Sequence, residues 1–385
     1  MRSTLSLDCA ARQWPVVVVG AGPAGSIAAL ELARLGVEVL LVDKAEFPRY
    51  KVCGCCLNPR GQAILSRCGL ASLPRRLGAV PTTTIRLASV GGRRADLPLA
   101  GGVSLSRSAL DSALVMAAVE RGVQFLPGTL ARLRAVDGGV RPIALKHGAA
   151  TVEARASVVV AGDGLGGRLL TRDEKVEEHI AARSRIGAGA VIEHLPGSPE
   201  FLEHVIYMSC GRFGYVGLVR LEDHRLAIAA AIEPRLVKAA GGLGAAAISI
   251  LEETGVGIPP AARVAKWRGV PELTRRATAA AAERVLAVGD AAGYVEPFTG
   301  EGMSWALTSG AAVAPVVAAA VQQWRPAIVQ EWTRAHADMV RRRQWTCRSL
   351  SLGLRSSMLT RSVIRILAHM PGLARPVVRS LLAVP

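Results

Sequence analysis

The sequence predicts an α/β fold, in which a Rossmann-like nucleotide-binding lobe is interleaved with an antiparallel-sheet lobe and followed by a helical C-terminal region. Three observations predict it: a strand–glycine turn–helix unit near the N-terminus, a second strand–glycine turn far downstream, and strand-like alternation between the two. The expected limits are 14–80, 100–185 and 275–330 for the nucleotide-binding lobe, 81–99 and 186–274 for the substrate-binding sheet lobe, and 331–385 for the helical region.

Composition excludes several classes of protein. The net charge of +17 could attract nucleic acid, acidic membranes or anionic ligands, but the arginines are dispersed, aromatics are only 4%, and no zinc-finger or RNA-binding signature occurs. We therefore expect no nucleic-acid partner. No export signal is recognisable, and the most apolar stretch, 310–321, is too short to span a membrane, so we expect it to be a buried helix. These features predict a cytoplasmic protein with reduced cysteines.

The first nucleotide-binding unit spans residues 14–44. A β-branched run, Val16 to Val19, is typical of a parallel strand that is covered on both faces. Gly20, Gly22 and Gly25 follow with G-x-G-x-x-G spacing, which permits a tight turn, close approach of a pyrophosphate and close packing of helix on strand. Asp43 ends the next strand, where a carboxylate can bind ribose and disfavours a 2′-phosphate.

The second unit lies at 284–310. The apolar strand Val285 to Val288 leads into Gly289 and Asp290, and a small-residue turn then leads into "FTGEGMSWAL", in which Gly300 and Gly302 precede an expected helix. Free backbone N–H groups at such a helix start can face an electron-rich ring or an oxyanion. Two such turns in one chain indicate a single extended dinucleotide.

Together these motifs resemble the superfamily of FAD-dependent monooxygenases, halogenases and geranylgeranyl reductases, which shares the para-hydroxybenzoate-hydroxylase fold. The resemblance covers roughly residues 14–325. It implies that the first turn holds the ADP half of FAD, that Gly289 and Asp290 contact the ribityl and pyrophosphate side, and that Pro297 to Gly302 border the isoalloxazine. Arg107, in "SLSRSALDSALVMAA", would approach the flavin. The implied FAD-binding residues are Gly20, Gly22, Pro23, Ala24, Gly25, Asp43, Lys44, Lys51, Cys53, Gly54, Arg107, Asp163, Gly289, Asp290, Pro297, Gly300, Glu301, Gly302 and Met303.

One motif departs from the superfamily pattern. Where members often carry D-G-x-x-S-x-x-R, this chain has "AGDGLGGRLL", with Asp163 kept, Gly167 at the Ser position and Leu170 at the Arg position. Arg168 is a candidate substitute for the missing arginine. The motif is associated with flavin and NAD(P)H contacts, so NAD(P)H is a candidate electron donor and the route of the electrons is left open.

A cysteine cluster lies in "FPRYKVCGCCLNPRG", residues 47–61. Lys51, Cys53 and Gly54 match the K-x-C-G loop that the geranylgeranyl-reductase-like branch places beside the flavin, whereas the G-E-S and W-x-W-x-I-P segments of halogenases are absent. The C-x-C-C spacing does not suit a structural zinc site, so we expect no metal. A disulfide between Cys53 and Cys56 is left open. Cys55 and Cys56 are interpreted as small apolar loop fillers, and Cys53 as a residue of the active site.

The expected substrate lobe contains a hairpin at 82–99 around Gly91 and Gly92, and two strands joined by the turn 222–224. Tyr215 occupies the place of an aromatic-rich G-Y-x-W-x-F-P segment in the reductase-like branch, but the Trp and Pro are missing, which predicts a pocket of different shape. Cys53 and Tyr215 are the candidate catalytic residues, and the latter could equally pack into the roof of the pocket.

Residues 335–385 repeat Arg between apolar residues at helical intervals. Either they form a helical subdomain with a solvated basic face, the slightly favoured interpretation, or they contact an anionic membrane, which would make the protein peripheral at the inner membrane face.

The functional prediction is an FAD-dependent oxidoreductase that acts on a hydrophobic or aromatic small molecule, because chemistry carried by a cofactor needs no catalytic triad. Geranylgeranyl-reductase-like reduction of a double bond is favoured. Oxygen-dependent hydroxylation by a monooxygenase and a non-catalytic flavin redox sensor are the alternatives.

Overall fold

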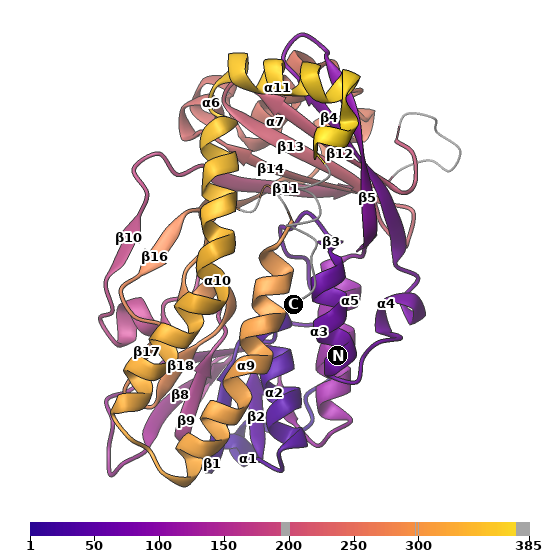
Figure 1. Ribbon diagram of the computed structural model, residues 1–385. Helices are drawn as coiled ribbons and strands as arrows, with labels where there is room; N and C mark the ends of the chain where they lie inside the picture. Colours follow the sequence, from indigo (N-terminus) through magenta and orange to yellow (C-terminus); the bar gives the residue numbers. More distant parts are fainter. Residues whose placement is uncertain (194–200, 297, 299, 375–385) are drawn as a thin grey trace.

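The computed structural model describes residues 1–193, 201–296, 298 and 300–374, and it has two large β-sheets, one at each end of the molecule (Figure 1). The α/β fold class predicted from the sequence is confirmed. The limits of the lobes stay predictions.

The lower sheet in Figure 1 has the order β17-β18-β9-β1-β2-β6, with β7 and β8 continuing from β9. Pairs β1–β2, β1–β9, β2–β6 and β9–β18 are parallel, and β1 is almost wholly buried because helices and strands cover both of its faces. The strands are β1 Gln13–Val19, β2 Val39–Val42, β6 Gln124–Leu126, β7 Thr129–Leu133, β8 Arg141–His147, β9 Ala150–Ala161, β17 Ala281–Ala282 and β18 Val285–Ala287.

Helices α2 (Pro23–Arg34), α3 (Pro59–Arg67), α5 (Arg107–Val119) and α9 (Gly302–Gln322) pack on one face of this sheet. Contact between α2 and α9 is close because Gly310 has no side chain: a Cβ there would lie 2.2 Å from the carbonyl oxygen of Ala24. On the other face, β7, β8 and the short helix α1 (Leu7–Ala10) complete a second apolar layer. The two ends of the sequence that carry the glycine motifs are thereby brought together.

The upper sheet has the order β15-β11-β14-β13-β12-β4-β5-β3 and is antiparallel except for the β4–β12 pair. Both predicted hairpins are confirmed, β4–β5 turning at Gly91 and Gly92, which have φ of 83° and 75°, and β13–β14 turning at 221–225. The strands are β3 Cys56–Leu57, β4 Val80–Ser89, β5 Arg94–Ser104, β11 Ile186–Ile192, β12 Val205–Gly211, β13 Gly214–Arg220, β14 Leu226–Ile232 and β15 Arg268–Glu272.

One face of the upper sheet is covered by α7 (Leu243–Thr254), with α6 (Pro234–Ala240) and α8 (Pro260–Val264) beside it. The opposite face supplies Met208, Tyr215 and Ala231 to a separate apolar cluster. That face lines the large cavity described below.

The C-terminal region begins with α10 (Ala327–Gly353), which runs along the molecule from the lower sheet to the upper end (Figure 1). Helix α11 (Ser357–His369) and the turn Pro371–Ala374 lie there against β4 and β5. Smaller elements are α4 (Leu73–Arg76), the π-helical turn Leu169–Asp173, the turn Gly289–Ala292 and the pair β10 (Glu178–Ile180)–β16 (Arg275–Ala277).

By length and composition, α9 is the one described helix that could cross a membrane, and the pair α6–α7, bent by 99°, would be a second if it were counted as one span. However, 56% of the apolar window in α9 is buried inside the protein. Burial of the stretch 310–321 was predicted from the sequence, and the structure shows its apolar side packed on α2.

Candidate functional site

A cavity of about 650 Å³ lies between the two sheets. Its polar part is bounded by the glycine turn after β1, the loop 49–57 and the start of α5, and its apolar part by the upper sheet. Most residues predicted to hold FAD line it: Gly20, Gly22, Pro23, Ala24, Asp43, Lys44, Lys51, Cys53, Gly54, Arg107, Asp163, Asp290, Gly300, Gly302 and Met303.

The other predicted residues lie elsewhere. Gly25 and Gly289 pack strands against helices, since a Cβ on Gly25 would lie 1.8 Å from the oxygen of Gly20 and one on Gly289 would lie 3.0 Å from the Cβ of Ala24. Glu301 is buried beside α10, and the thiol of Cys347 lies 3.7 Å from its carboxyl oxygen. Burial raises the pKa of Glu301 to about 7. Pro297 lies outside the described residues.

The glycine turn leaves no room for side chains. Gly20 has a φ of 103°, and a Cβ there would lie 2.2 Å from the oxygen of Gly162. Helix α2 begins directly after Gly22, so its free N–H groups point into the polar part of the cavity, where they favour an anion.

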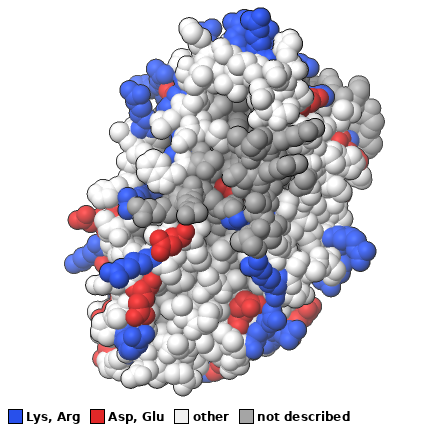
Figure 2. Space-filling view, viewed as in Figure 1, with Lys and Arg blue, Asp and Glu red and all other residues white. Residues whose placement is uncertain are grey.

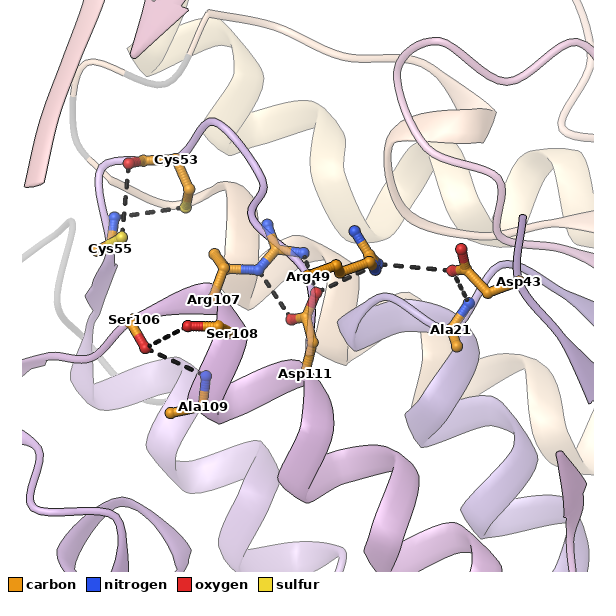
Figure 3. A network of polar contacts seen from close by, with 10 residues as sticks. All are labelled: Ala21, Asp43, Arg49, Cys53, Cys55, Ser106, Arg107, Ser108, Ala109 and Asp111. Carbon is orange, nitrogen blue, oxygen red and sulfur yellow. Dashed lines mark hydrogen bonds and ion pairs between the residues drawn. The ribbon is translucent and has the colours of Figure 1, made fainter. Parts of the chain in front are cut away.

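Two guanidinium groups lie beside this turn (Figure 3). The fully buried carboxylate of Asp111 accepts hydrogen bonds from Arg107 Nε and Nη2 at 2.8 and 2.9 Å and lies 3.2 Å from Arg49 Nη2. The Cβ position of Gly22 is 3.5 Å from Arg49 Nη2 and 3.8 Å from Arg107 Nη2. Buried Arg49 Nε has no hydrogen-bond partner among the described residues. Both guanidinium groups are thus ion-paired with Asp43 or Asp111, and the Nε–H of Arg49 is left to bind an anionic ligand.

Asp43 lies at the same end of the cavity. Its carboxylate accepts hydrogen bonds from the N–H groups of Ala21 and Ala45, both at 2.8 Å, and is 3.6 Å from Arg49 Nη2. The predicted ribose-binding acid thus also holds the glycine turn in shape. Sequence reasoning missed Arg49 and Asp111: the i,i+4 spacing of Arg107 and Asp111 on one helix was a signal for their ion pair, whereas the contact of Asp111 with Arg49 becomes visible only in the folded chain.

The cysteine loop forms the wall between the polar and apolar parts. Cys53 Sγ accepts a hydrogen bond from the N–H of Cys55 at 3.4 Å. Hydrogen bonding with Cys55, supported by the charge of Arg107 and opposed by burial, lowers the pKa of Cys53 from 9.0 to about 6. A thiolate at this position is therefore favoured at neutral pH.

The two neighbouring cysteines have different surroundings. Cys55 is buried against Val219, Leu221 and Ala227, and its hydrogen bond with Cys53 together with burial raises its pKa well above the ordinary value. Burial raises the pKa of Cys56 to about 12. The apolar packing agrees with the interpretation of Cys55 as a loop filler. In the described part of the chain, no group of three His, Cys, Asp or Glu side chains is arranged to hold a metal ion.

The atypical segment at 163–170 has a structural explanation. Asp163 accepts hydrogen bonds from the N–H groups of Arg168 at 2.7 Å and Leu169 at 3.2 Å. A Cβ on Gly167 would lie 2.2 Å from Asp163 Oδ2, so a serine at this position would require the carboxylate of Asp163 to move. Burial raises the pKa of Asp163. Arg168 lines the cavity, but its guanidinium makes no hydrogen bond to a described residue that would define a role.

Lys51 and Asp290 complete the polar wall. Burial, together with the charges of Arg107 and Arg49, lowers the pKa of Lys51, and burial raises the pKa of Asp290 against the opposing effect of Lys51. Both groups line the cavity.

The apolar part is formed mainly by strands of the upper sheet. Its larger side chains are Ile85, Leu99, Ile206, Met208, Tyr215, Val219, Val270, Leu273 and Phe298. Gly217 lies in this wall where the reductase-like pattern has Trp. A Cβ on Gly217 would lie 3.1 Å from Met208 Sδ, so Met208 occupies part of the space that a Trp side chain would need.

Tyr215 contacts Phe298 edge-to-face, with ring centroids 5.0 Å apart. Its hydroxyl hydrogen-bonds Glu296, which is itself paired with fully buried Arg185 at 2.8 Å. Burial raises the pKa of Tyr215 well above its ordinary value. The ring lines the cavity, and the hydroxyl contacts the Glu296–Arg185 pair. This arrangement matches one of the two roles considered for Tyr215 from the sequence, that of a residue packed into the roof of the pocket.

Comparisons with known proteins agree with this geometry. A family described as "FAD binding domain" matches residues 13–342. The menaquinone reductase of Mycobacterium tuberculosis is 38% identical over 139 residues, which cover 34% of this chain and 33% of the relative. Thus the match spans about one third of that relative's length. Digeranylgeranylglycerophospholipid reductase 2 of Methanothermobacter thermautotrophicus is 26% identical over 330 residues, which cover 81% and 80%.

Among solved structures, a geranylgeranyl bacteriochlorophyll reductase-like protein from Thermoplasma acidophilum superimposes with a TM-score of 0.77 and 20% identity, covering 93% of this chain and 92% of that one. A flavin-dependent halogenase and a p-nitrophenol 4-monooxygenase share the fold with TM-scores of 0.73 and 0.75. The fold alone therefore does not identify the reaction.

The glycine turn yields a direct prediction about FAD. Gly22→Leu should abolish bound FAD, because a branched side chain would fill the space between the turn and the two guanidinium groups. Gly257→Ala is the control, since a Cβ there meets no atom within 4 Å and Gly257 is not among the residues that line the cavity. Flavin absorbance of the purified variants, with circular dichroism to check folding, measures the effect. A folded Gly22→Leu protein that retains stoichiometric FAD would contradict this placement.

Proposed function

Because the chain belongs to the FAD-binding domain family and is an FAD-dependent oxidoreductase, we propose that it reduces a carbon–carbon double bond of an isoprenoid-type substrate. One observation carries the proposal: the Cys53 thiol lies where the polar FAD-binding part of the cavity meets the apolar part. A reacting double bond would have to lie at this junction.

The polar residues fit FAD. Arg49, Arg107 and the N-terminus of α2 would hold the pyrophosphate, and Asp43 the ribose. Bound FAD, once reduced, supplies the hydride. The chain's own task is then to hold the substrate over the flavin, to exclude water and to deliver a proton.

Cys53 is the proposed proton donor. A general acid works best when its pKa is close to the operating pH, and the pKa of Cys53 lies at about 6. The positive charge of Arg107 stabilises the thiolate that remains when the proton leaves. Tyr215 is assigned a positioning role, because its hydroxyl is engaged by Glu296.

An apolar chain is the substrate class that the cavity suits best. The upper-sheet wall is aliphatic and aromatic, as an apolar chain requires, and Gly217 contributes no side chain to it. Two relatives named above are reductases whose names specify a menaquinone and a digeranylgeranyl lipid. Their names support an isoprenoid-bearing substrate for this chain.

The proposed reaction is tested by a single turnover without oxygen. Chemically reduced enzyme should convert a menaquinone or a geranylgeranyl lipid into a product with two added hydrogens, detected by mass spectrometry. Cys53→Ser should slow the step by roughly 10²–10⁴-fold while FAD stays bound. The rate should fall as the pH rises through about 6, because the thiol form that carries the proton disappears.

Cys9→Ser is the matched control, since Cys9 is exposed and far from the cavity lining. Product that forms only in air and contains an oxygen atom from ¹⁸O₂ would establish the monooxygenase instead. Reduced flavin that never transfers electrons to an organic acceptor would favour the redox sensor.

We further propose that the C-terminal region touches an anionic membrane. Of the fourteen exposed large hydrophobic side chains among the described residues, eight lie between 345 and 373: Trp345, Leu352, Met358, Leu359, Val363, Ile366, Met370 and Leu373. No Asp or Glu follows Asp338 in the sequence, whereas arginines recur. In Figure 2 the upper end of the molecule, where α11 and the β4–β5 hairpin lie, shows white surface with blue side chains at its summit.

The contacts of α11 with the cavity lining support a role of this helix in substrate entry from the membrane. Ile364 and Leu367 pack in the same apolar cluster as Met208, Tyr215 and Leu273, which line the cavity. A surface of exposed apolar and basic side chains thus adjoins the apolar end of the cavity. Anionic lipid complements both properties.

The membrane proposal predicts co-sedimentation with anionic vesicles but not with neutral ones, weakened by salt. Replacing both Arg361 and Arg365 with Gln should lower the affinity roughly tenfold or more, since each basic residue near the surface contributes about 1 kcal/mol. Val264→Ser, at a side chain 88% exposed on α8, is the control. Equal vesicle binding by wild type and the double variant would contradict the membrane proposal and would favour the interpretation of residues 335–385 as a helical subdomain.

A further inference from the structure

Two thiols of the cysteine loop lie against each other in the cavity wall (Figure 3). Cys55 N donates to Cys53 Sγ at 3.4 Å, and Cys55 Sγ donates to the carbonyl oxygen of Cys53 at 3.6 Å. Both contacts are therefore between a thiol of one residue and the backbone of the other. Because Cys53 and Cys55 are two residues apart, the chain allows their Cα atoms to be at most about 7 Å from each other. That limit is close to the Cα–Cα range that a disulfide requires.

The backbone brings Cys55 into this position. Cys55 has a φ of 55°, a left-handed conformation that few residues other than glycine adopt, and the conformation folds the chain back toward Cys53. Gly54 between them has open space around its Cβ position, and the carbonyl oxygen of Cys55 accepts one hydrogen bond from Leu105 N at 2.9 Å. A strained residue beside a cofactor is typical of a functional constraint.

Cys56 is differently held. Its backbone pairs with Ser104 of β5, and its thiol donates to the carbonyl oxygen of Gly54 at 3.1 Å. The pairing in the sheet opposes the movement that a bond with Cys53 would need. Cys55 is therefore the better partner for Cys53.

The pair is also chemically asymmetric. Arg107, anchored by Asp111, favours the thiolate of Cys53, whereas Cys55 lies in an apolar cluster that favours its thiol. A thiolate beside a protonated thiol is the combination in which an electron pair leaves the sulfurs most readily.

We propose that Cys53 and Cys55 form a redox-active dithiol that exchanges an electron pair with FAD. The Cys53 thiolate and the Cys55 thiol together lose two electrons and one proton and form one S–S bond. The electrons and the proton pass to oxidised FAD, which is reduced by one hydride equivalent, so atoms and charge balance. The reverse reaction returns the electron pair to the sulfurs. The pair thus doubles the number of electrons that the cavity stores and gives a thiol reductant a route to the flavin.

The test is an anaerobic reductive titration of the FAD-loaded, air-oxidised protein with dithionite. Wild type should consume two electron pairs per FAD, and Cys55→Ser only one. Cys56→Ser, the matched control in the same loop, should still consume two. FAD content and the flavin spectrum of each variant show whether it has folded.

Iodoacetamide labelling and mass spectrometry give a second readout. After denaturation, the peptide that holds Cys53, Cys55 and Cys56 should carry one label in oxidised wild type, at Cys56, and three labels in reduced wild type. One electron pair in wild type, or loss of the second pair in Cys56→Ser instead of Cys55→Ser, would overturn the assignment. Neither readout uses an organic substrate, so the result is independent of whether the protein reduces double bonds.

Discussion

The buried carboxylate of Asp111 is the constraint on which the centre of the cavity depends. It is fully inaccessible, and it binds Arg107 through two hydrogen bonds while lying 3.2 Å from Arg49. Two guanidinium groups so close together repel each other, and a buried charge without a partner is costly. Asp111 offsets that repulsion and thereby holds both guanidinium groups at the polar end of the cavity, with Arg107 beside Cys53.

The same arrangement explains why a thiol in an apolar wall is ionised. Burial by itself raises the pKa of a cysteine, as it does for Cys56 and Cys210. Cys53 differs because it receives a hydrogen bond from Cys55 and the field of Arg107, and these outweigh burial. The polar half of the cavity thus determines the chemistry of a residue that faces the apolar half.

Sequence motifs predicted the local geometry well, because they report on contacts within one turn. The glycines after β1 and the acid at the end of β2 lie where the spacing predicted, and the family comparison confirms FAD as the cofactor. Asp111 and Arg49 could not be found in this way, since they meet through the packing of α5 against the loop after β2. The pairing of Glu301 with Cys347 of α10 is another contact between distant segments that no motif encodes.

The departures from the superfamily pattern were visible in the sequence, but their meaning was not. Gly167 stands at the serine position, and in this chain the carboxylate of Asp163 occupies the space beside it. Gly217 replaces a Trp and leaves part of the cavity wall without a side chain. Since halogenases and a monooxygenase have the same fold, these replacements and the cysteine loop, rather than the architecture, carry the information about the reaction.

The most direct test of this account is the pH dependence of alkylation at Cys53. Trace labelling with iodoacetamide across a pH series, read residue by residue by mass spectrometry, gives the fraction of thiolate at each pH. Because the pKa is lowered, reactivity should be lost only as the pH falls through about 6, and Arg107→Met should move the midpoint upward. A wild-type midpoint near the ordinary value of 9.0 that Arg107→Met leaves unchanged would contradict the account.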